Sequence, residues 1–226
     1  MGKISVEKHF DAMARDFEKV KRKVIPGYRD IEKCVFSYPP FTQSRKIAVL
    51  ELGTGTGALA RDVLKHFPRA TYTGIDFSSK MLEVASHRLR KWDQRVTLHK
   101  ADLNRVKIAG RYDLILSLFT IHHIINKKGL FKHLCTLLKP GGCFLYGDVA
   151  VSKNRRLERC FIENWKAFMA RSGLPKEKIG RVIKDHRHYD HPEPLETQLR
   201  FLKGAGFKGY DIVWCREKSG VFFATK

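Results

Sequence analysis

The glycine-rich segment at residues 51–57 constrains the fold of this chain more than any other feature of the sequence. It reads Glu-Leu-Gly-Thr-Gly-Thr-Gly, follows the apolar run 47–50 and precedes a helical pattern at 58–66. Because glycine has no side chain, backbone N–H groups in such a strand–loop–helix unit can approach a ligand closely. The segment therefore predicts an α/β fold with a ligand bound at the end of its first strand.

Short apolar runs alternate with helical patterns from residue 46 to residue 148, as in a parallel sheet wrapped by helices. We expect strands at 47–50, 71–75, 96–99, 114–117 and 143–146. A helix capped by Ser78 should follow the second strand. A further helix should stop at the turn Lys139-Pro140-Gly141-Gly142. Near the end of the chain, a helix at 195–203 should precede a hairpin of strands at 207–213 and 221–225.

The segments outside this core predict a lid. Residues 1–45 carry apolar residues at helical spacing (Phe10, Met13, Phe17, Val20 and Val24), followed by a break and a short helix at 28–36. The remaining residues, 46–226, form the main domain with a basic helical insertion at about 150–194. Ligands in open α/β sheets lie outside the carboxyl ends of the strands, so we expect both additions to cover the ligand.

Composition restricts the partners and the compartment. A formal charge of +21, from 44 basic and 23 acidic residues, indicates an anionic partner or, alternatively, a solvated basic surface. No apolar run approaches the ~20 residues that span a bilayer, and no signal peptide is visible, so we expect a cytoplasmic protein without membrane contact, monomeric or homodimeric. The five cysteines are widely spaced, without a Cys-x-x-Cys pair, which indicates free thiols and predicts no metal site.

The acidic residues at strand ends bear on the cofactor. Gly53, Gly55 and Ala58 also satisfy the loose dinucleotide pattern, so the loop alone does not separate a nicotinamide enzyme from a methyltransferase. Asp76, at the end of the second strand, can accept hydrogen bonds from the ribose hydroxyls of the cofactor in either class of enzyme. Asp102, after the third strand, can accept a hydrogen bond from an adenine amino group, which a nicotinamide enzyme does not require.

Five ordered motifs between residues 46 and 148 resemble the class I S-adenosylmethionine-dependent methyltransferases. They are Val-Leu-Glu-Leu-Gly-Thr-Gly-Thr-Gly (49–57), Gly-Ile-Asp (74–76), Ala-Asp-Leu (101–103), Tyr-Asp-Leu-Ile (112–115) and Leu-Lys-Pro-Gly-Gly (138–142). The resemblance implies a Rossmann-like, seven-stranded, mostly parallel sheet with helices on both faces and an antiparallel last strand.

The same resemblance implies a set of residues that bind S-adenosylmethionine. The methionine part falls to Glu51, Gly53, Thr54, Gly55 and Gly57, and the ribose to Asp76, with Phe77 and Met81 beside it. The adenine falls to Asp102 and Leu103. The sulfonium lies beside Ser117, Leu118 and Phe119.

The outer segments resemble a narrower group, the tRNA wobble-uridine carboxymethyltransferase-like proteins. The similarity rests on Phe10-Asp11-Ala12-Met13-Ala14, on residues 21–28, on Leu195-Glu196-Thr197-Gln198-Leu199 and on the closing Val221-Phe222-Phe223-Ala224. It implies that a carboxylated form of the cofactor is possible. Relatives of this kind act on RNA and on small molecules, so the resemblance leaves the acceptor open.

Candidate acceptor residues follow the fourth strand and lie in the insertion. His122 and His123 are the catalytic candidates, able to orient or deprotonate an acceptor. Arg187 can bind a carboxylate or phosphate, and Tyr189 and Trp165 can line a pocket, although the helical spacing of Trp165 favours core packing.

The sequence thus predicts methyl transfer to an anionic or aromatic acceptor, either a small metabolite or an RNA nucleotide. The alternatives are an NAD-dependent oxidoreductase on a Rossmann fold and a non-catalytic nucleic-acid-binding module. The latter rests on charge alone, because the chain has no recognisable nucleic-acid-binding motif.

Overall fold

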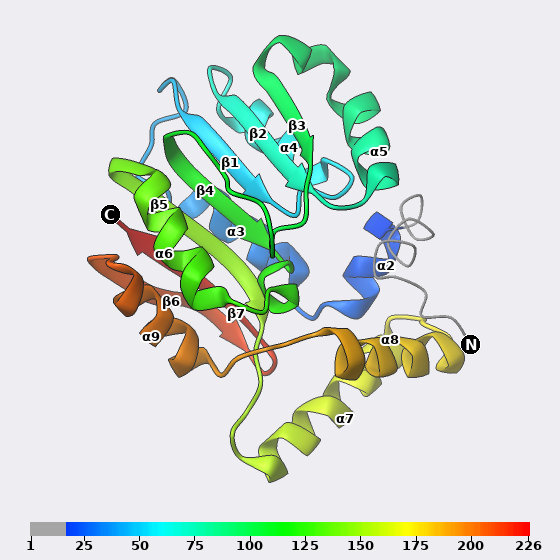
Figure 1. Ribbon diagram of the computed structural model, residues 1–226. Helices are drawn as coiled ribbons and strands as arrows, with labels where there is room; N and C mark the ends of the chain where they lie inside the picture. The colour runs from blue at the N-terminus through cyan, green and yellow to red at the C-terminus, as the bar shows by residue number, and fades with distance from the viewer. Residues whose placement is uncertain (1–16) are drawn as a thin grey trace.

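One sheet organises the protein, whose computed structural model describes residues 17–226 (Figure 1). Its seven strands have the order β3-β2-β1-β4-β5-β7-β6. The first five are parallel to their neighbours, and β7 is antiparallel to both β5 and β6. The bounds are β1 (Ala48–Leu52), β2 (Thr71–Asp76), β3 (Val96–Lys100), β4 (Tyr112–Leu118), β5 (Leu138–Val149), β6 (Gly209–Arg216) and β7 (Ser219–Thr225). The expected seven-stranded, mostly parallel sheet is confirmed.

Helices cover both faces of the sheet because successive strand residues point to opposite sides. On β1, Val49 packs into the cluster formed with α3 (Tyr28–Ser37), α4 (Ala58–His66) and α5 (Ser79–Leu89). The next residue, Leu50, packs into the cluster formed with α6 (Lys127–Leu137) and α9 (Leu195–Ala205). Both residues are almost fully buried. The central strands, covered on both sides, are accordingly mainly apolar, with Glu51 on β1 and Asp113 and Ser117 on β4 as buried polar exceptions.

Local capping chemistry sets several helix ends. The Ser78 hydroxyl accepts a hydrogen bond from the Met81 N–H at 3.1 Å, which confirms Ser78 as the N-cap of α5. The Asn126 side chain caps α6 in the same way, and α9 ends at Gly206 in the left-handed conformation. Two 3₁₀ turns, η1 (Arg90–Arg95) and η2 (Ile121–His123), complete the connections.

The structure corrects the expected start of the fifth strand. β5 begins at Leu138 rather than at residue 143, because Leu138 pairs with Tyr112 on β4 before a register shift leads into the regular pairing. The Pro-Gly-Gly segment is therefore part of β5 and forms its irregular start. Gly142 fits there because a Cβ would lie 2.9 Å from the carbonyl oxygen of Asp113. The hairpin also extends further than expected, with β6 reaching Arg216.

Three helices form a separate layer beyond the carboxyl ends of the parallel strands (Figure 1). These are α2 (Phe17–Val24), α7 (Arg155–Arg171) and α8 (Lys176–Tyr189). They share a small apolar cluster, whose buried members are Ile162, Trp165, Met169, Leu174 and Ile183. This layer is called the lid below.

The division into residues 1–45 and 46–226 stays a prediction. Of the helices described before residue 45, α2 belongs to the lid, whereas α3 packs in the main core through Ile31 and Val35. The residues expected to begin the first helix, including Phe10 and Met13, lie outside the described residues.

The thiols and the helix lengths complete the picture. All five cysteines are free, with Cys34, Cys135 and Cys143 buried and Cys160 and Cys215 exposed. Among the helices of residues 17–226, each is too short or too polar to cross a bilayer.

Candidate functional site

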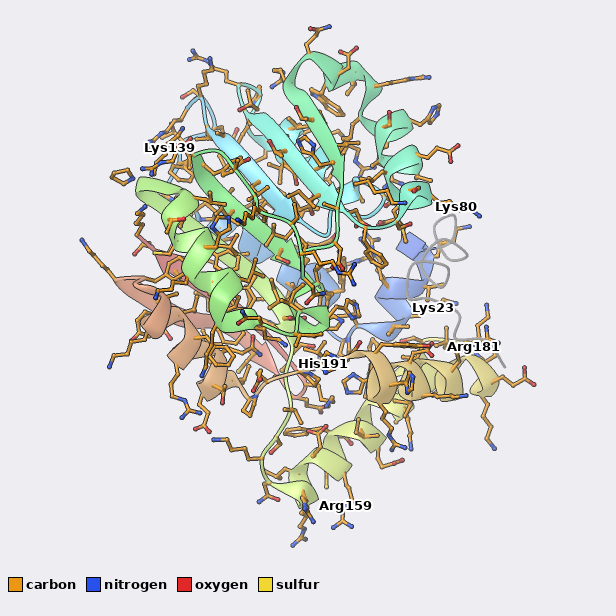
Figure 2. The ribbon with its side chains drawn as sticks, in the orientation of Figure 1. Lys23, Lys80, Lys139, Arg159, Arg181 and His191 are labelled. Atoms are coloured by element: carbon orange, nitrogen blue, oxygen red, sulfur yellow. The ribbon has the colours of Figure 1, made fainter. Side chains whose placement is uncertain are left out.

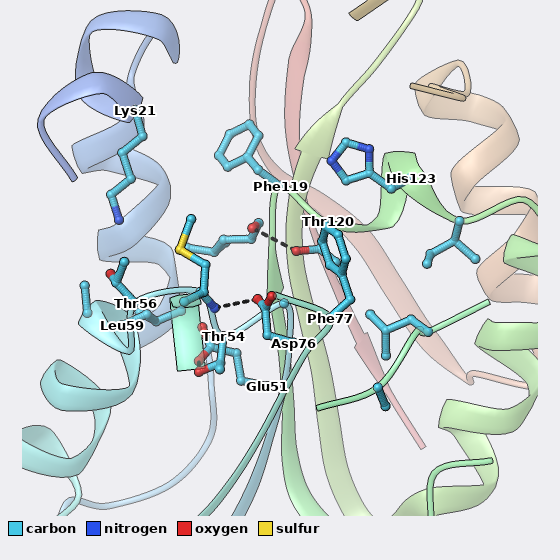
Figure 3. Close-up of a pocket in the computed structure, with 18 of the residues that line it drawn as sticks. Lys21, Glu51, Thr54, Thr56, Leu59, Asp76, Phe77, Phe119, Thr120 and His123 are labelled. Atoms are coloured by element: carbon cyan, nitrogen blue, oxygen red, sulfur yellow. Dashed lines mark hydrogen bonds between the residues drawn. The ribbon is translucent and has the colours of Figure 1, made fainter. Parts of the chain in front are cut away.

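A cavity of about 330 Å³ opens at the carboxyl ends of β1, β2 and β4 (Figure 3). We call it the first cavity; its volume falls within the ~300–1,000 Å³ typical of small-molecule sites. Eleven of the thirteen residues expected to bind the cofactor line it, namely Glu51, Gly53, Thr54, Gly55, Asp76, Phe77, Met81, Asp102, Leu103, Leu118 and Phe119. The other two, Gly57 and Ser117, support its wall.

The glycine loop owes its composition mainly to packing. Gly53 and Gly57 have φ of 71° and Gly55 has φ of 52°, a region that other residues rarely adopt. A Cβ on Gly53 would collide with the Thr120 side chain, and one on Gly57 would lie 3.0 Å from the Cβ of Ala85. Gly53 and Gly55 both line the cavity, and the Gly55 N–H donates to Asp76. The positive φ angles and these close contacts therefore require glycine at positions 53 and 57, and Gly55 lies beside the ligand space.

Asp76 fixes the loop to the end of β2. Its Oδ2 accepts a hydrogen bond from the Gly55 N–H at 2.8 Å, and its Oδ1 accepts one from the Ser78 N–H at 3.0 Å. Asp76 also lines the first cavity, where its carboxylate can accept hydrogen bonds from ligand hydroxyls. Asp102 differs, because its side chain is 49% exposed at the rim and accepts a hydrogen bond from the Asn104 N–H at 2.9 Å.

Glu51 forms the buried polar floor of the first cavity. Its Oε2 accepts hydrogen bonds from the Thr54 hydroxyl at 2.5 Å and from the Tyr72 hydroxyl at 2.6 Å. Burial raises the pKa of this carboxyl to about 7, although both hydrogen bonds and the charge of Lys21 act in the opposite direction. Glu51 is therefore a carboxylate that a bound cation would hold in its ionised form.

Two residues of α2 close the first cavity, and the sequence analysis did not assign them to it. The Thr56 hydroxyl donates to Glu18 at 2.8 Å, and Glu18 in turn pairs with Lys21 at 2.7 Å. The Lys21 ammonium lies 4.6 Å from the centre of the Tyr28 ring. Figure 3 shows the Lys21 side chain reaching from α2 over the cavity. Nothing in the sequence around Lys21 indicates that its side chain would reach the first cavity.

A second cavity, of about 200 Å³, lies between the lid and the β6–β7 turn. Its wall is largely apolar and includes Val20, Val24, Ile25, Val149, Trp165 and Val182. Trp165 is buried, and its indole N–H donates to the Val24 carbonyl at 2.6 Å, which joins α7 to α2. Trp165 therefore packs in the lid cluster and also lines the cavity.

The two remaining acceptor candidates, Tyr189 and Arg187, differ in their position relative to the cavities. Tyr189 lines both cavities. Arg187 is exposed on α8 and lines neither of them, so its role toward a carboxylate stays a prediction without a contact that supports it.

Four residues line both cavities and mark the place where they meet: Lys21, Phe119, His123 and Tyr189. Phe119 has φ of 55°, a left-handed conformation that is unusual for a bulky side chain. Its N–H donates to the Gly147 carbonyl at 2.8 Å, which holds this backbone against β5. Strained residues of this kind cluster at functional sites.

The two catalytic candidates lie at the same junction. His122 is buried, and its Nδ1 lies 2.5 Å from Oδ1 of Asp148. Burial acts to lower the pKa of His122, but the charge and hydrogen bond of Asp148 outweigh it and raise the pKa. His123 has its Nδ1 3.2 Å from Oδ1 of Asp190, and burial together with the charge of His122 lowers its pKa.

The basic residues of the lid, apart from Lys21, line neither cavity. Among those expected to serve an anionic acceptor, every one except Lys21 is exposed: Lys19, Arg22, Lys23, Arg155, Arg156, Arg159, Arg181, Lys184 and Arg187. Figure 2 shows Arg159 and Arg181 extending from the outer side of α7 and α8. These nine basic residues therefore contribute to the outer surface of the lid rather than to either cavity.

Fold and site together define an α/β protein that binds a nucleotide-like ligand beyond the carboxyl ends of its strands. Comparison with known proteins narrows this class. A sequence model described as a methyltransferase domain matches residues 50–144. The malonyl-[acyl-carrier protein] O-methyltransferase of Priestia megaterium is 34% identical over 145 residues, 62% of this chain and 52% of the relative.

Other relatives match along nearly the whole chain. The carboxy-S-adenosyl-L-methionine synthase of Nautilia profundicola is 21% identical over 98% of this chain and 96% of the relative. The chain thus spans about half the length of the Priestia relative and nearly all of the Nautilia one. Phosphoethanolamine N-methyltransferase 2 of Haemonchus contortus, solved with S-adenosyl-L-methionine, has the same fold, with a TM-score of 0.71 at 18% identity over 98% of this chain and 58% of that one.

The chain therefore carries a methyltransferase domain at residues 50–144 and is similar to S-adenosylmethionine-dependent methyltransferases. The cofactor of that family is S-adenosylmethionine, and the first cavity fits it chemically. Glu51 offers a carboxylate floor for a cationic amine, the Asp76 carboxylate is of the type that binds ribose hydroxyls, and the apolar side chains of Met81 and Leu103 suit a purine ring. The residue assignments within the cavity remain proposals.

Proposed function

We propose that this protein transfers a methyl group from S-adenosylmethionine, bound in the first cavity, to a small acceptor with an apolar or aromatic body, bound in the second. The observation that carries the proposal is the second cavity itself, which is walled by apolar side chains and meets the first cavity at Phe119 and His123. S-adenosylmethionine supplies a cationic sulfonium that is already a good methyl donor, so alignment is the protein's main task.

The protein's own residues supply that alignment. Phe119 lines both cavities where they meet, so its ring can pack against both ligands and hold the acceptor atom next to the methyl group. The polar group of the acceptor faces the junction, where His123 and Tyr189 are within reach, while its apolar body lies against Trp165 and Val182. The lid covers the acceptor and excludes water from the reacting groups.

The size and lining of the second cavity favour a small molecule over a nucleotide in folded RNA. A cavity of about 200 Å³ holds one compact ring system. The arginines of the lid that could neutralise RNA phosphates, Arg155, Arg156, Arg159 and Arg181, are exposed and do not line the second cavity. An RNA acceptor would need those residues and an extruded base.

A methyl-transfer assay with a radiolabelled methyl donor tests the proposal, using a small-metabolite extract and bulk tRNA in parallel. We expect label in the metabolite fraction. Val182→Trp, which fills the second cavity, should abolish transfer, whereas Leu157→Trp, which places the same indole on an exposed position of α7, should not.

The triple variant Arg155→Ala, Arg156→Ala and Arg159→Ala decides between the acceptor classes. Transfer to a small acceptor should be unchanged in this variant. Labelling of tRNA that is lost in the triple variant and falls by roughly 0.7–0.9 log units per log unit of salt for each phosphate contact would overturn the proposal in favour of RNA.

A further inference from the structure

A cluster of three potential metal ligands lies where the two cavities meet. His122, His123 and Asp190 offer ligand atoms that all lie within 4.8 Å of one another. Oδ1 of Asp190 is 3.2 Å from Nδ1 of His123 and 3.8 Å from Nε2 of His122. A tetrahedral ion with bonds of ~2.1 Å separates its ligand atoms by ~3.4 Å, so the two separations from Asp190 are close to this value and the third, between the two histidines, is at most 4.8 Å.

We propose that His122, His123 and Asp190 bind a divalent transition-metal ion, such as Zn²⁺ or Fe²⁺, beside the acceptor cavity. Two imidazoles and one carboxylate are the donor set that such ions accept, and three protein ligands leave coordination positions open, as in catalytic metal sites. This inference goes beyond the proposed function and departs from the expectation, drawn from the cysteines, that the chain holds no metal.

Outer partners orient two of the three ligands. Nδ1 of His122 is held by Asp148 at 2.5 Å, which directs the other ring nitrogen toward Asp190. Oδ2 of Asp190 is held by Nδ1 of His186 at 2.7 Å, which leaves Oδ1 facing the histidines. Metal-binding histidines characteristically have their second nitrogen on a carboxylate in this way.

The backbone around the cluster is built to bring distant segments together. The His191 N–H donates to the His122 carbonyl at 2.7 Å, and the Lys127 ammonium donates to the carbonyls of both Ile124 and His191 at 2.6 Å. These bonds join the η2 turn to the end of α8. The cation of Lys127 is thus engaged by carbonyl oxygens, while the carboxylates of Asp148 and Asp190 face the histidines.

The cluster is also sheltered and accessible to a small ligand. The side chains of His122, His123 and Asp190 are 8%, 21% and 13% exposed. His123 lines both cavities, and His122 and Asp190 line the second. An ion at this position would have its open side toward the acceptor, where it would favour acceptors that carry an oxygen or nitrogen ligand.

Metal binding to the full chain, freed of metal by a chelator, tests the inference directly. Calorimetry with Zn²⁺ should show one ion bound per chain, and Co²⁺ should develop the visible absorption bands of coordination by nitrogen and oxygen. His123→Ala and Asp190→Asn should lose both signals. Asp148→Asn, which changes only an outer partner, should weaken Zn²⁺ binding by about 10–100-fold.

His188→Ala is the matched control, because His188 is an exposed histidine on α8 outside the cluster, and it should bind Zn²⁺ as the unchanged protein does. Circular dichroism and S-adenosylhomocysteine binding establish that each variant is folded. Absence of stoichiometric Zn²⁺ binding, or equal binding by the folded His123→Ala and Asp190→Asn variants, would overturn the inference.

The two proposals fail separately. A protein that binds Zn²⁺ at these residues but methylates no small acceptor would leave the metal site standing and remove the proposed function. A protein that methylates a small acceptor but binds no Zn²⁺ or Co²⁺ would do the reverse.

Discussion

The two cavities are built in different ways. The first is lined mainly by residues at the ends of β1, β2 and β4 and the loops that follow them, with α2 added across its mouth. The second takes its lining from α2, the segment after β4, α7, α8 and the β6–β7 turn, which are far apart in the chain. A site at strand ends follows from the core of the fold, whereas a site under the lid depends on how separate helices pack on one another.

Removal of Trp165 should produce the largest difference between the two cavities in their response to one substitution. Trp165→Ala deletes a buried indole from the lid cluster and its hydrogen bond to Val24, so we expect a loss of about 3–5 kcal/mol in the free energy of unfolding. Acceptor turnover should fall with it. Binding of S-adenosylhomocysteine should change little, because Glu18 still ties α2 to the glycine loop through Thr56.

Denaturation in urea and calorimetry measure these two effects. Trp165→Phe serves as the control, since it retains an aromatic ring while it loses the hydrogen bond, worth about 1 kcal/mol, and part of the volume of the indole. A parallel fall in S-adenosylhomocysteine affinity would show that the cavities are not independent.

Asp76→Ala should act on the first cavity alone. Loss of a charged hydrogen-bond partner from a buried site should weaken S-adenosylhomocysteine binding by about 1–3 kcal/mol. Part of that loss reflects the Gly55 and Ser78 N–H groups left without their carboxylate. Calorimetry against Asp93→Ala, a change on the η1 turn outside the cavity, gives the comparison. Equal affinity of the two variants would remove Asp76 from the binding site.

Glu51 should make cofactor binding depend on pH. Its pKa of about 7 in the folded protein lies above the usual 4.5, so the carboxyl becomes protonated as the pH falls through 7. The proposed partner, a cationic amine, needs the ionised form. Affinity for S-adenosylhomocysteine should therefore be constant well above pH 7 and about tenfold lower, or ~1.4 kcal/mol, for each pH unit well below it.

The sign of the effect on stability is the opposite. A carboxyl with a raised pKa stabilises the unliganded fold fully below pH 4.5 and loses that contribution as the pH rises to about 7. Calorimetry across pH 5.5–8.5 with Glu51→Gln, whose weaker binding should be flat, checks the assignment. His123→Ala should retain the slope; if it removes the slope, the titrating group is at the junction instead.

Local chemistry explains what the sequence predicted well. Ser78 caps α5 through its own neighbours, and Asp76 follows from the end of a strand beside the glycine loop. The early start of β5, before Cys143, was not predicted. Pairing with Tyr112 extends this strand through residues whose local preference is a turn. Tertiary pairing therefore overrode a strong local signal at that point.

Long-range packing explains what the sequence did not show. Lys21 reaches the first cavity only because α2 settles against the glycine loop and α7. Asp148 and Asp190 were each visible as acidic residues, but their meeting at His122 depends on α8 returning to the η2 turn. No spacing in the sequence encodes such a return, so the polar cluster became visible only in the fold.

The positive φ of Phe119 lowers stability at a position where the side chain lines both cavities. A left-handed conformation costs a residue with a side chain about 1–2 kcal/mol, and glycine would avoid this cost. A selection for thermal stability would therefore favour glycine at this position. A selection for turnover would keep the ring, which lines both cavities and lies 6.0 Å from the Tyr28 ring. Variants of this fold that carry glycine at residue 119 would thus be expected to have lost the ring that lines both cavities.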